Sequence, residues 1–201
     1  MGSISKDKLV ITIGVLVTVA MLVGAVFLLS GNSKQSSSTN KGANASLDSL
    51  VDKAAPDFTL ESYNGKKVTL SSLKGKNVVL FFSEGLMCYP ACWDQIAAFG
   101  KDSEFTNKNT VVLTIVNDPK DEWKGAVEKM PELAQATVLL DTDKKVSIDY
   151  KMLSLPSSMH KGQLPGHTYV IIDKNGVARY VKDDVQMAVR NQELIAEIDK
   201  L

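Results

Sequence analysis

An apolar stretch near its start limits where this chain of 201 residues can fold. Residues 9–29 contain no charged side chain, and about 20 such residues suffice to cross the core of a bilayer as a helix. A cleaved signal peptide has a shorter apolar core, about 7–15 residues, and a small-residue cleavage site, which this stretch lacks. We therefore predict an uncleaved transmembrane helix over residues 9–29, after a short N-terminus over residues 1–8.

The lysines on either side of this stretch predict its orientation. Lys6 and Lys8 precede it closely, whereas Lys34 and Lys41 lie farther downstream. The positive-inside tendency then keeps residues 1–8 in the cytoplasm and exports the rest of the chain. Residues 30–46 are mostly small and polar, so we expect a flexible linker before one globular domain over residues 47–201. The predicted location is the cell membrane, with a single span and an extracytoplasmic domain.

The balance of charge argues against some classes of partner. The chain has 23 basic and 23 acidic side chains, which gives no electrostatic reason to expect nucleic acid. Arg179 and Arg190 are its only arginines. Bidentate clamps on phosphate or carboxylate groups are therefore not expected.

Apolar patterns in residues 47–201 alternate between those of strands and those of helices. Short alternating or continuous apolar runs predict strands, while Pro90 and Pro119 suit the first turns of two helices. The expected strands lie at 58–60, 68–70, 78–82, 111–116, 137–140, 170–172 and 177–181, and the expected helices at 90–100, 118–131, 146–153 and 191–201. This order predicts a three-layer α/β domain with a mixed sheet, in which 58–70 and 170–181 form hairpins.

The only two cysteines, Cys88 and Cys92, fall between a buried strand and the first turn of a helix. Residues four apart on a regular helix have Cβ atoms about 5–6 Å apart, farther than a disulfide allows. A disulfide therefore requires Cys88 to lie off the helix, which Pro90 favours. The helix N-terminus stabilises a thiolate. We expect Cys88 to attack a partner disulfide and Cys92 to resolve the mixed disulfide, the alternative being a buried, inert pair.

Four segments resemble the redoxin domains of the thioredoxin-like superfamily, which include peroxiredoxins of the AhpC/TSA type and membrane-tethered thiol–disulfide oxidoreductases. The resemblance rests on the sequences at 55–60 (APDFTL), 65–70 (GKKVTL), 73–82 (LKGKNVVLFF) and 170–176 (VIIDKNG). It covers most of the predicted domain and implies a thioredoxin-like fold, a mixed central sheet flanked by helices. It implies redox chemistry at the cysteines without fixing the reaction.

Two departures from the peroxiredoxin pattern shift the expected reaction. Peroxiredoxins place a threonine three residues before the reacting cysteine, but Gly85 and Tyr89 stand at the two corresponding positions. Their peroxide-stabilising arginine precedes a late strand, and here His167 occupies that place. The usual groups that polarise a peroxide bond are then absent, so peroxidase activity, if present, is expected to be weak.

Two further residues are candidates for supporting roles. Pro165 lies near the position of the thioredoxin cis-proline; a trans Pro165 that starts the turn at Gly166 is the equal alternative. Glu84, four residues before Cys88, could relay protons to a buried thiol, whereas a solvated loop carboxylate is the commoner outcome.

A third group of relatives offers a different function. Sco-type copper chaperones are membrane-tethered, thioredoxin-like, and carry a Cys-x-x-x-Cys pair with a later histidine, which Cys88, Cys92 and His167 reproduce. Two thiolates and an imidazole suit copper. Tyr89 and Trp93, however, stand where the Sco pattern has prolines. Copper delivery is therefore the alternative to the expected function.

The expected function is that of a membrane-anchored, extracytoplasmic thiol–disulfide oxidoreductase with Cys88 and Cys92 as its redox pair. We expect it to need no cofactor. Its partners would be protein thiols and disulfides, and the tether would bring a membrane electron donor within reach.

Overall fold

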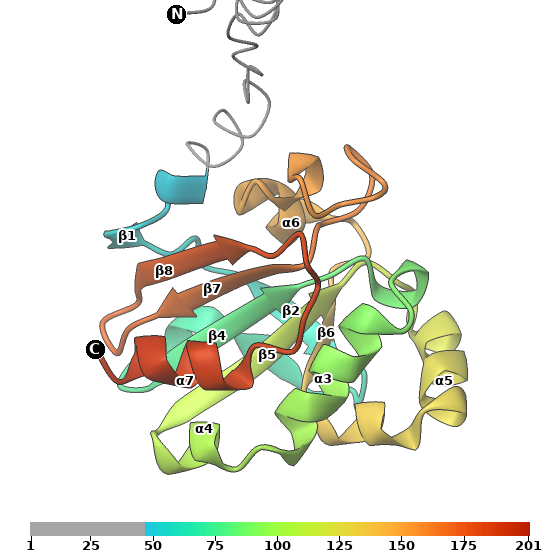
Figure 1. Ribbon diagram of the computed structural model, residues 1–201, viewed down its shortest axis with the longest axis horizontal. Helices are drawn as coiled ribbons and strands as arrows, with labels where there is room; N and C mark the ends of the chain where they lie inside the picture. The colour runs from blue at the N-terminus through green and yellow to red at the C-terminus, as the bar shows by residue number, and fades with distance from the viewer. Residues whose placement is uncertain (1–46) are drawn as a thin grey trace, which may run out of the picture. The chain divides into compact units, whose positions relative to one another are not determined.

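The computed structural model describes residues 47–201, which form an α/β domain (Figure 1). Within this range no helix is both long enough and apolar enough to span a membrane. The predicted transmembrane helix at 9–29 and the predicted linker at 30–46 lie outside the described residues.

A mixed sheet of eight strands runs through the domain in the order β1-β8-β7-β4-β5-β6-β2-β3. The β4–β5 and β5–β6 pairs are parallel, and all other pairs of neighbouring strands are antiparallel. The strands are β1 (Lys53–Ala54), β2 (Thr59–Ser62), β3 (Lys67–Thr69), β4 (Asn77–Phe82), β5 (Thr110–Val116), β6 (Val138–Leu140), β7 (Thr168–Ile172) and β8 (Val177–Asp183).

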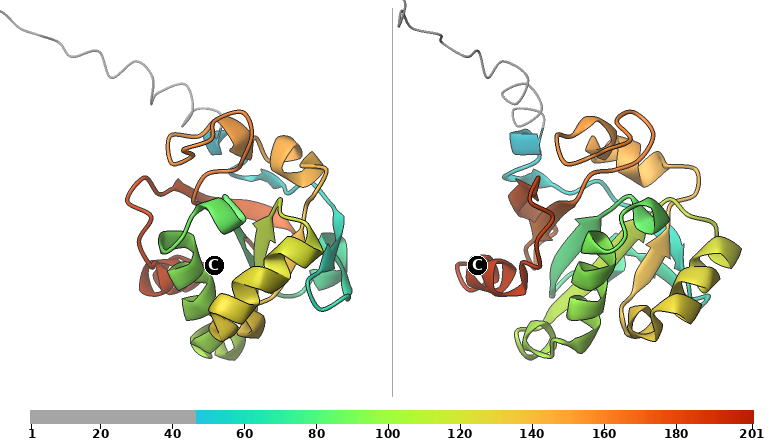
Figure 2. Two further views of the ribbon diagram at one scale, coloured as in Figure 1. Left: turned by 90° about the vertical axis from the view of Figure 1, so that its right-hand side faces the viewer. Right: turned by 45° about the vertical axis from the view of Figure 1, so that its right-hand side comes forward.

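Helices cover both faces of the sheet, as Figure 2 shows. α3, α4, α5 and α7 pack on one face, while α6 and the turns around it pack on the other. The α-helices are α3 (Ala91–Lys101), α4 (Glu104–Asn107), α5 (Lys120–Lys129), α6 (Lys145–Asp149) and α7 (Asn191–Ile198). Four short 3₁₀ helices are η1 (Leu70–Leu73), η2 (Gly85–Met87), η3 (Pro131–Gln135) and η4 (Met152–Ser154).

After its first residue, Asn77, β4 is apolar, because both of its faces are covered. Every residue of this strand is buried. Val79 and Phe81 face the core under α3, whereas Val78, Leu80 and Phe82 face the core under α6. A central strand between two helical layers has to supply apolar side chains to both sides, which explains its continuous run.

The predicted fold class and both predicted hairpins are confirmed. β2 pairs with β3 around the turn at Asn64 and Gly65, and β7 pairs with β8 around the turn at 174–176. The structure also has β1 and α4, which the apolar pattern did not predict because each is too short to show a period. α3 begins one residue after Pro90 and continues past Gly100 to Lys101. A Cβ atom at Gly100 would lie 2.8 Å from the Gln135 Cβ atom, so only glycine fits there.

The pairing of β4 with β7 determines which parts of the chain meet at one end of the sheet. These strands are antiparallel, and Phe82 lies opposite Thr168. The end of β4 therefore lies beside the start of β7. This register brings the segment after residue 82, which carries both cysteines, next to His167.

Candidate active site

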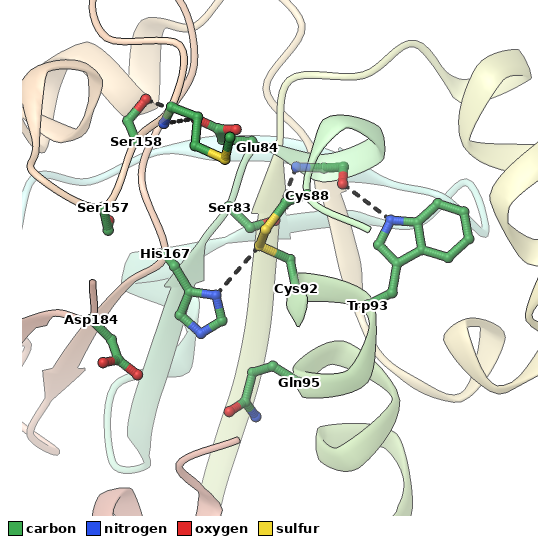
Figure 3. The surroundings of a disulfide bond; sticks show 12 residues. Ser83, Glu84, Cys88, Cys92, Trp93, Gln95, Ser157, Ser158, His167 and Asp184 are labelled. Carbon is green, nitrogen blue, oxygen red and sulfur yellow. Dashed lines mark hydrogen bonds between the residues drawn. A yellow bond between two sulfur atoms is a disulfide. The ribbon is translucent and has the colours of Figure 1, made fainter. Parts of the chain in front are cut away.

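The two cysteines form a disulfide at the corner between β4 and α3 (Figure 3). Their Cα atoms are 5.3 Å apart, which lies within the range that a disulfide requires. Cys88 directly follows η2 and has a non-helical backbone conformation. The Tyr89–Pro90 peptide that comes next is cis. Cys92 is the second residue of α3, and its backbone N–H donates to the Cys88 carbonyl oxygen at 2.9 Å. Cys88 thus lies off the helix, as the spacing required.

The two sulfur-bearing residues differ in access to solvent. Cys88 is 8 % exposed, whereas Cys92 is fully buried at 0 %. Of the two cysteines, Cys88 is therefore the one nearer to solvent. Cys88 also lies just before the N-terminus of α3, where unpaired N–H groups favour a thiolate.

His167 approaches the disulfide from the other side of the corner (Figure 3). Its Nδ1 atom is 3.4 Å from the Cys92 Sγ atom, and its Nε2 atom is 2.7 Å from the Tyr169 hydroxyl oxygen. The ring is 1 % exposed and packs edge-on against Phe81. Burial lowers the pKa of His167 to about 4, although Asp184 partly opposes this effect. The imidazole is therefore neutral at neutral pH.

Glu84 is buried beside the corner and holds a distant loop. Its Oε1 atom accepts hydrogen bonds from the backbone N–H groups of Met159 and His160 and from the Ser158 hydroxyl, and its Oε2 atom lies 3.0 Å from the His160 ring. Burial would raise the pKa of Glu84, but these hydrogen bonds outweigh it and lower the pKa. Glu84 is thus not a solvated carboxylate, and its hydrogen bonds go to the 158–160 loop and not to either sulfur.

Pro165 does not take the cis-proline role. The Leu164–Pro165 peptide is trans, since the one cis peptide bond among residues 47–201 precedes Pro90. The trans alternative for Pro165 therefore holds. The next residue, Gly166, packs so closely on the 157–158 backbone and side chains that a Cβ atom there would lie 2.1 Å from the Ser157 hydroxyl.

A half-buried acid, Asp118, lies beside the cysteine corner on the loop between β5 and α5. The Oδ2 atom of Asp118 accepts a hydrogen bond from the Leu86 N–H at 3.2 Å. Burial raises the pKa of Asp118 to about 6. On the same side, Trp93 donates its indole N–H to the Gly85 carbonyl at 3.1 Å. These two hydrogen bonds hold η2 against α3 and β5.

The ligand atoms of Cys88, Cys92 and His167 lie within 4.8 Å of one another. No other group of three or more His, Cys, Asp or Glu residues in the range 47–201 is arranged this way. In the disulfide form the two sulfurs are bonded to each other. Only the reduced form would offer two thiolates to a soft cation.

Both arginines are committed to ion pairs away from the sulfurs. Arg179 pairs with Asp52 and Asp173. Arg190 pairs with Asp184, with its Nε atom 2.8 Å from the carboxylate. Neither takes the place of the peroxiredoxin arginine.

Comparison with known proteins identifies the family. The AhpC/TSA family model matches residues 51–181, more than half of the chain. This chain belongs to the AhpC/TSA family. It is 36 % identical over 132 residues to the chloroplastic peroxiredoxin Q of Suaeda salsa, covering 63 % of this chain and 56 % of that protein. It is 34 % identical over 134 residues to the chloroplastic peroxiredoxin Q of Oryza sativa subsp. japonica, covering 64 % of this chain and 56 % of that protein. The chain thus spans little more than half the length of these curated relatives.

Two solved structures share the fold of this chain. The mitochondrial 2-Cys peroxiredoxin of Plasmodium falciparum superimposes with a TM-score of 0.64 at 29 % identity, covering 75 % of this chain and 93 % of that chain. A putative protein disulfide isomerase of Bacteroides thetaiotaomicron superimposes with a TM-score of 0.57 at 22 % identity, covering 75 % and 88 %. The second likeness concerns the fold alone. Together they confirm the thioredoxin-like architecture.

Sequence reasoning missed three residues of this site. In the sequence, Tyr169 and Gln95 look like ordinary strand and helix residues. In the structure their side chains lie behind His167, and the Tyr169 hydroxyl donates to Gln95 Oε1 at 2.9 Å. The sequence predicts that Asp118 begins a helix, but α5 begins at Lys120, so Asp118 lies in the loop before it. A tyrosine two residues after His167, on the same face of a strand, was the one available signal.

We predict that Gly85→Ala destabilises the fold and disturbs the cysteine corner. Gly85 has φ +57°, and a Cβ atom there would lie within 3.0 Å of the Asp118 carboxylate. The strained φ costs about 1–2 kcal/mol, and the clash adds to it. We expect a loss of at least about 2 kcal/mol in the free energy of unfolding, measured by urea denaturation. Gly125→Ala, in an open helical position of α5, is the control, and it should stabilise by about 0.5–1 kcal/mol.

We predict that Asp118→Asn stabilises the protein at alkaline but not at acidic pH. The pKa of Asp118 is raised to about 6 in the folded state, above its unfolded value, so the folded state binds the proton more tightly. The ionised carboxylate therefore destabilises the fold above pH 6, and this cost vanishes as the pH falls below the unfolded value. Because the side chain is partly exposed, we expect a gain of about 1–2 kcal/mol at pH 8.

Urea denaturation of wild type and Asp118→Asn at about pH 8 and about pH 4 measures this effect. Asp48→Asn, at an exposed position, is the control and should change the free energy of unfolding by less than about 0.5 kcal/mol. An equal shift at both pH values for Asp118→Asn would contradict the prediction.

Proposed function

We propose that this chain is a membrane-anchored, extracytoplasmic thiol–disulfide oxidoreductase that cycles between the Cys88–Cys92 disulfide and the dithiol. The observation that carries the proposal is the bonded pair at a strand-to-helix corner, with Cys88 partly accessible and Cys92 fully buried. A redox pair needs one sulfur that a partner can reach and one that reacts only within the protein. The predicted span at 9–29 supports the membrane part of the proposal.

The exchange proceeds through a mixed disulfide. The Cys88 thiolate attacks one sulfur of the partner disulfide, an S–S bond forms between them, and the other partner sulfur leaves as a thiolate. Cys92 then attacks the Cys88 sulfur and releases the second partner sulfur. Two electrons pass from the dithiol to the partner, which ends as two thiols, and the reverse sequence oxidises a partner dithiol.

Peroxide reduction is the less supported reaction. A peroxidase needs groups that stabilise charge on the departing oxygen. Both arginines are ion-paired with aspartates, and His167 beside the sulfurs is neutral. The family's peroxiredoxin members carry the reaction in their names, but this chain spans only part of their length.

A protein partner fits the surroundings of Cys88. Met87 and Tyr89 flank it with exposed side chains, and Met159 is exposed on the loop that Glu84 holds. Exposed apolar side chains next to a reactive sulfur offer contact area to a protein partner, and methionine adapts to varied partners. Protein thiols and disulfides are therefore the proposed substrates, and a membrane electron donor is the proposed source of reducing equivalents.

We predict that the two cysteines have separable roles. Cys88→Ser should reduce exchange with a model disulfide by at least about 100-fold, because it removes the attacking thiolate. Cys92→Ser should still attack but should accumulate the mixed disulfide, which mass spectrometry of the intact protein detects. Thr106→Ser, at an exposed position of α4, is the control and should retain full activity. If both serine variants kept wild-type exchange, the proposal would be wrong.

Copper delivery is the rival function for the same side chains. The close approach of two sulfurs and an imidazole is what copper would require, but it is equally what a redox pair with a neighbouring histidine requires. The disulfide favours the redox function. A titration of the reduced protein with Cu(I) against a competing chelator tests the choice, and tight binding that His167→Ala weakens would favour copper.

A further inference from the structure

The protonation of His167 follows from a chain of hydrogen bonds behind it. The ring has two nitrogen atoms, and in the neutral form only one of them carries a proton. Nδ1 faces Cys92 Sγ and Nε2 faces the Tyr169 hydroxyl. Which nitrogen carries the proton decides what His167 can do to the sulfur.

At the end of this hydrogen-bond chain farthest from His167, the orientation of each side chain is fixed by neighbouring groups that can only donate or only accept a hydrogen bond. The backbone N–H of Arg190 donates to Gln95 Oε1 at 2.7 Å. The Gln95 amide N–H₂ group donates to Asn191 Oδ1 at 2.8 Å. Asn191 in turn donates to the Ala98 carbonyl and the Asp102 carboxylate. The Gln95 amide therefore has one orientation, with its oxygen toward Tyr169.

Tyr169 passes this constraint on to the histidine. Its hydroxyl lies 2.9 Å from Gln95 Oε1 and 3.3 Å from the Ala188 carbonyl oxygen. Both of these atoms are acceptors, so the single hydroxyl proton points to them. The hydroxyl oxygen must then accept a hydrogen bond from His167, which puts the proton on Nε2 and leaves the Nδ1 lone pair directed at Cys92.

We propose that His167 is a catalytic residue that accepts the Cys92 thiol proton when Cys92 resolves the mixed disulfide, and that Tyr169 and Gln95 are positioning residues that fix its tautomer. This inference rests on the proposed function and adds a base to it. In the resolving step the S–H proton moves to Nδ1. The Cys92–Cys88 bond forms as the bond from Cys88 to the partner breaks, and the partner sulfur leaves as a thiolate.

Cys92 needs such a base more than Cys88 does. Cys92 is fully buried, and burial among apolar side chains disfavours a thiolate. Because Cys92 has no exposed surface, solvent takes its proton only slowly. The groups that face the His167 ring are Cys92 from α3, Tyr169 from β7, and Asp184, Arg190 and the Ala188 backbone carbonyl from the segment between β8 and α7. Asp184 and Arg190 form an ion pair with each other.

A two-step reaction of the reduced, full-length protein with dithiobis-nitrobenzoate separates the two sulfurs. Attack by Cys88 releases one coloured thionitrobenzoate, and resolution by Cys92 releases the second. Stopped-flow absorbance resolves the two phases. We expect His167→Gln to slow the second phase by about 100-fold near pH 6, and the first phase by less than about threefold, because Cys88 does not use this base.

The pH profile distinguishes a base from a structural residue. In the wild type the proton is shared within the Cys92–His167 pair, so the second phase should be nearly flat from about pH 5.5 to about 7.5. In His167→Gln the thiol must lose its proton to solvent, so the rate should rise about tenfold per pH unit over this range. A structural role would lower the rate equally at every pH and slow both phases.

Two tyrosine variants guard against a folding defect in His167→Gln. Tyr169→Phe keeps the imidazole but removes the acceptor for Nε2–H, and it should slow the second phase by about threefold to tenfold. Tyr150→Phe removes the hydroxyl of a buried tyrosine in the core on the other face of the sheet, where it donates to the Pro56 carbonyl, and it should leave both phases unchanged. Equal slowing by the two variants would overturn the assignment.

Nitrogen NMR of histidine-labelled, reduced protein reads the tautomer directly. We expect a proton on Nε2 and none on Nδ1 of His167 at neutral pH; a proton on Nδ1 would overturn the inference. The two proposals fail differently. If the wild type shows no second release, the proposed function fails. If release is biphasic but His167→Gln is unaffected in rate and pH slope, only the role of His167 is wrong.

Discussion

The antiparallel pairing of β4 with β7 is the constraint on which the site depends. Side chains alternate between the two faces of a strand, so His167 and Tyr169 point to the same face, toward α3. A shift of the pairing by one residue would turn both side chains to the α6 face. The register of Phe82 opposite Thr168 therefore fixes both the nearness of the histidine to the cysteines and the side from which it approaches. The apolar side chains of β4 hold this register because both of its faces are buried.

The polar groups behind the disulfide are buried at little cost because their hydrogen bonds are satisfied. Among the described residues, the buried side-chain atoms without a hydrogen-bond partner belong to Asn77, Thr114, Asn117 and Trp123. None of these lies in the chain from His167 to Asn191. A buried polar group left unpaired costs about 1–3 kcal/mol, so a complete chain can be kept in the core. Because every hydrogen bond in this chain is made, each of its side chains is held in a single orientation. Water molecules in place of these side chains could reorient.

The sequence predicted the local features of the site better than its long-range contacts. Apolar periodicity located the strands that form the sheet, and the spacing of the cysteines with Pro90 correctly required Cys88 to lie off the helix. Such features depend on residues close together in the chain. The partners of Glu84 and Gln95 lie about 75 to 95 positions away, and no local pattern marks them. The sequence alone does not fix the distance from Pro165 to the next strand, so it leaves both isomers of the preceding peptide open; β7 begins at Thr168.

The binding of Glu84 to the 158–160 loop has a consequence for how partners are selected. Opening that loop would strip a buried carboxylate of its four hydrogen bonds, and breaking a buried charged arrangement of this kind costs about 3–5 kcal/mol. A partner that opened the loop would lose this free energy from binding, and each 1.4 kcal/mol lost weakens its affinity about tenfold. We therefore expect the 158–160 loop to stay closed and rigid when a partner binds near Cys88. Partners would be selected by how well their own shape fits this closed surface. Only the partner and the exposed methionine side chains would change conformation to improve the fit.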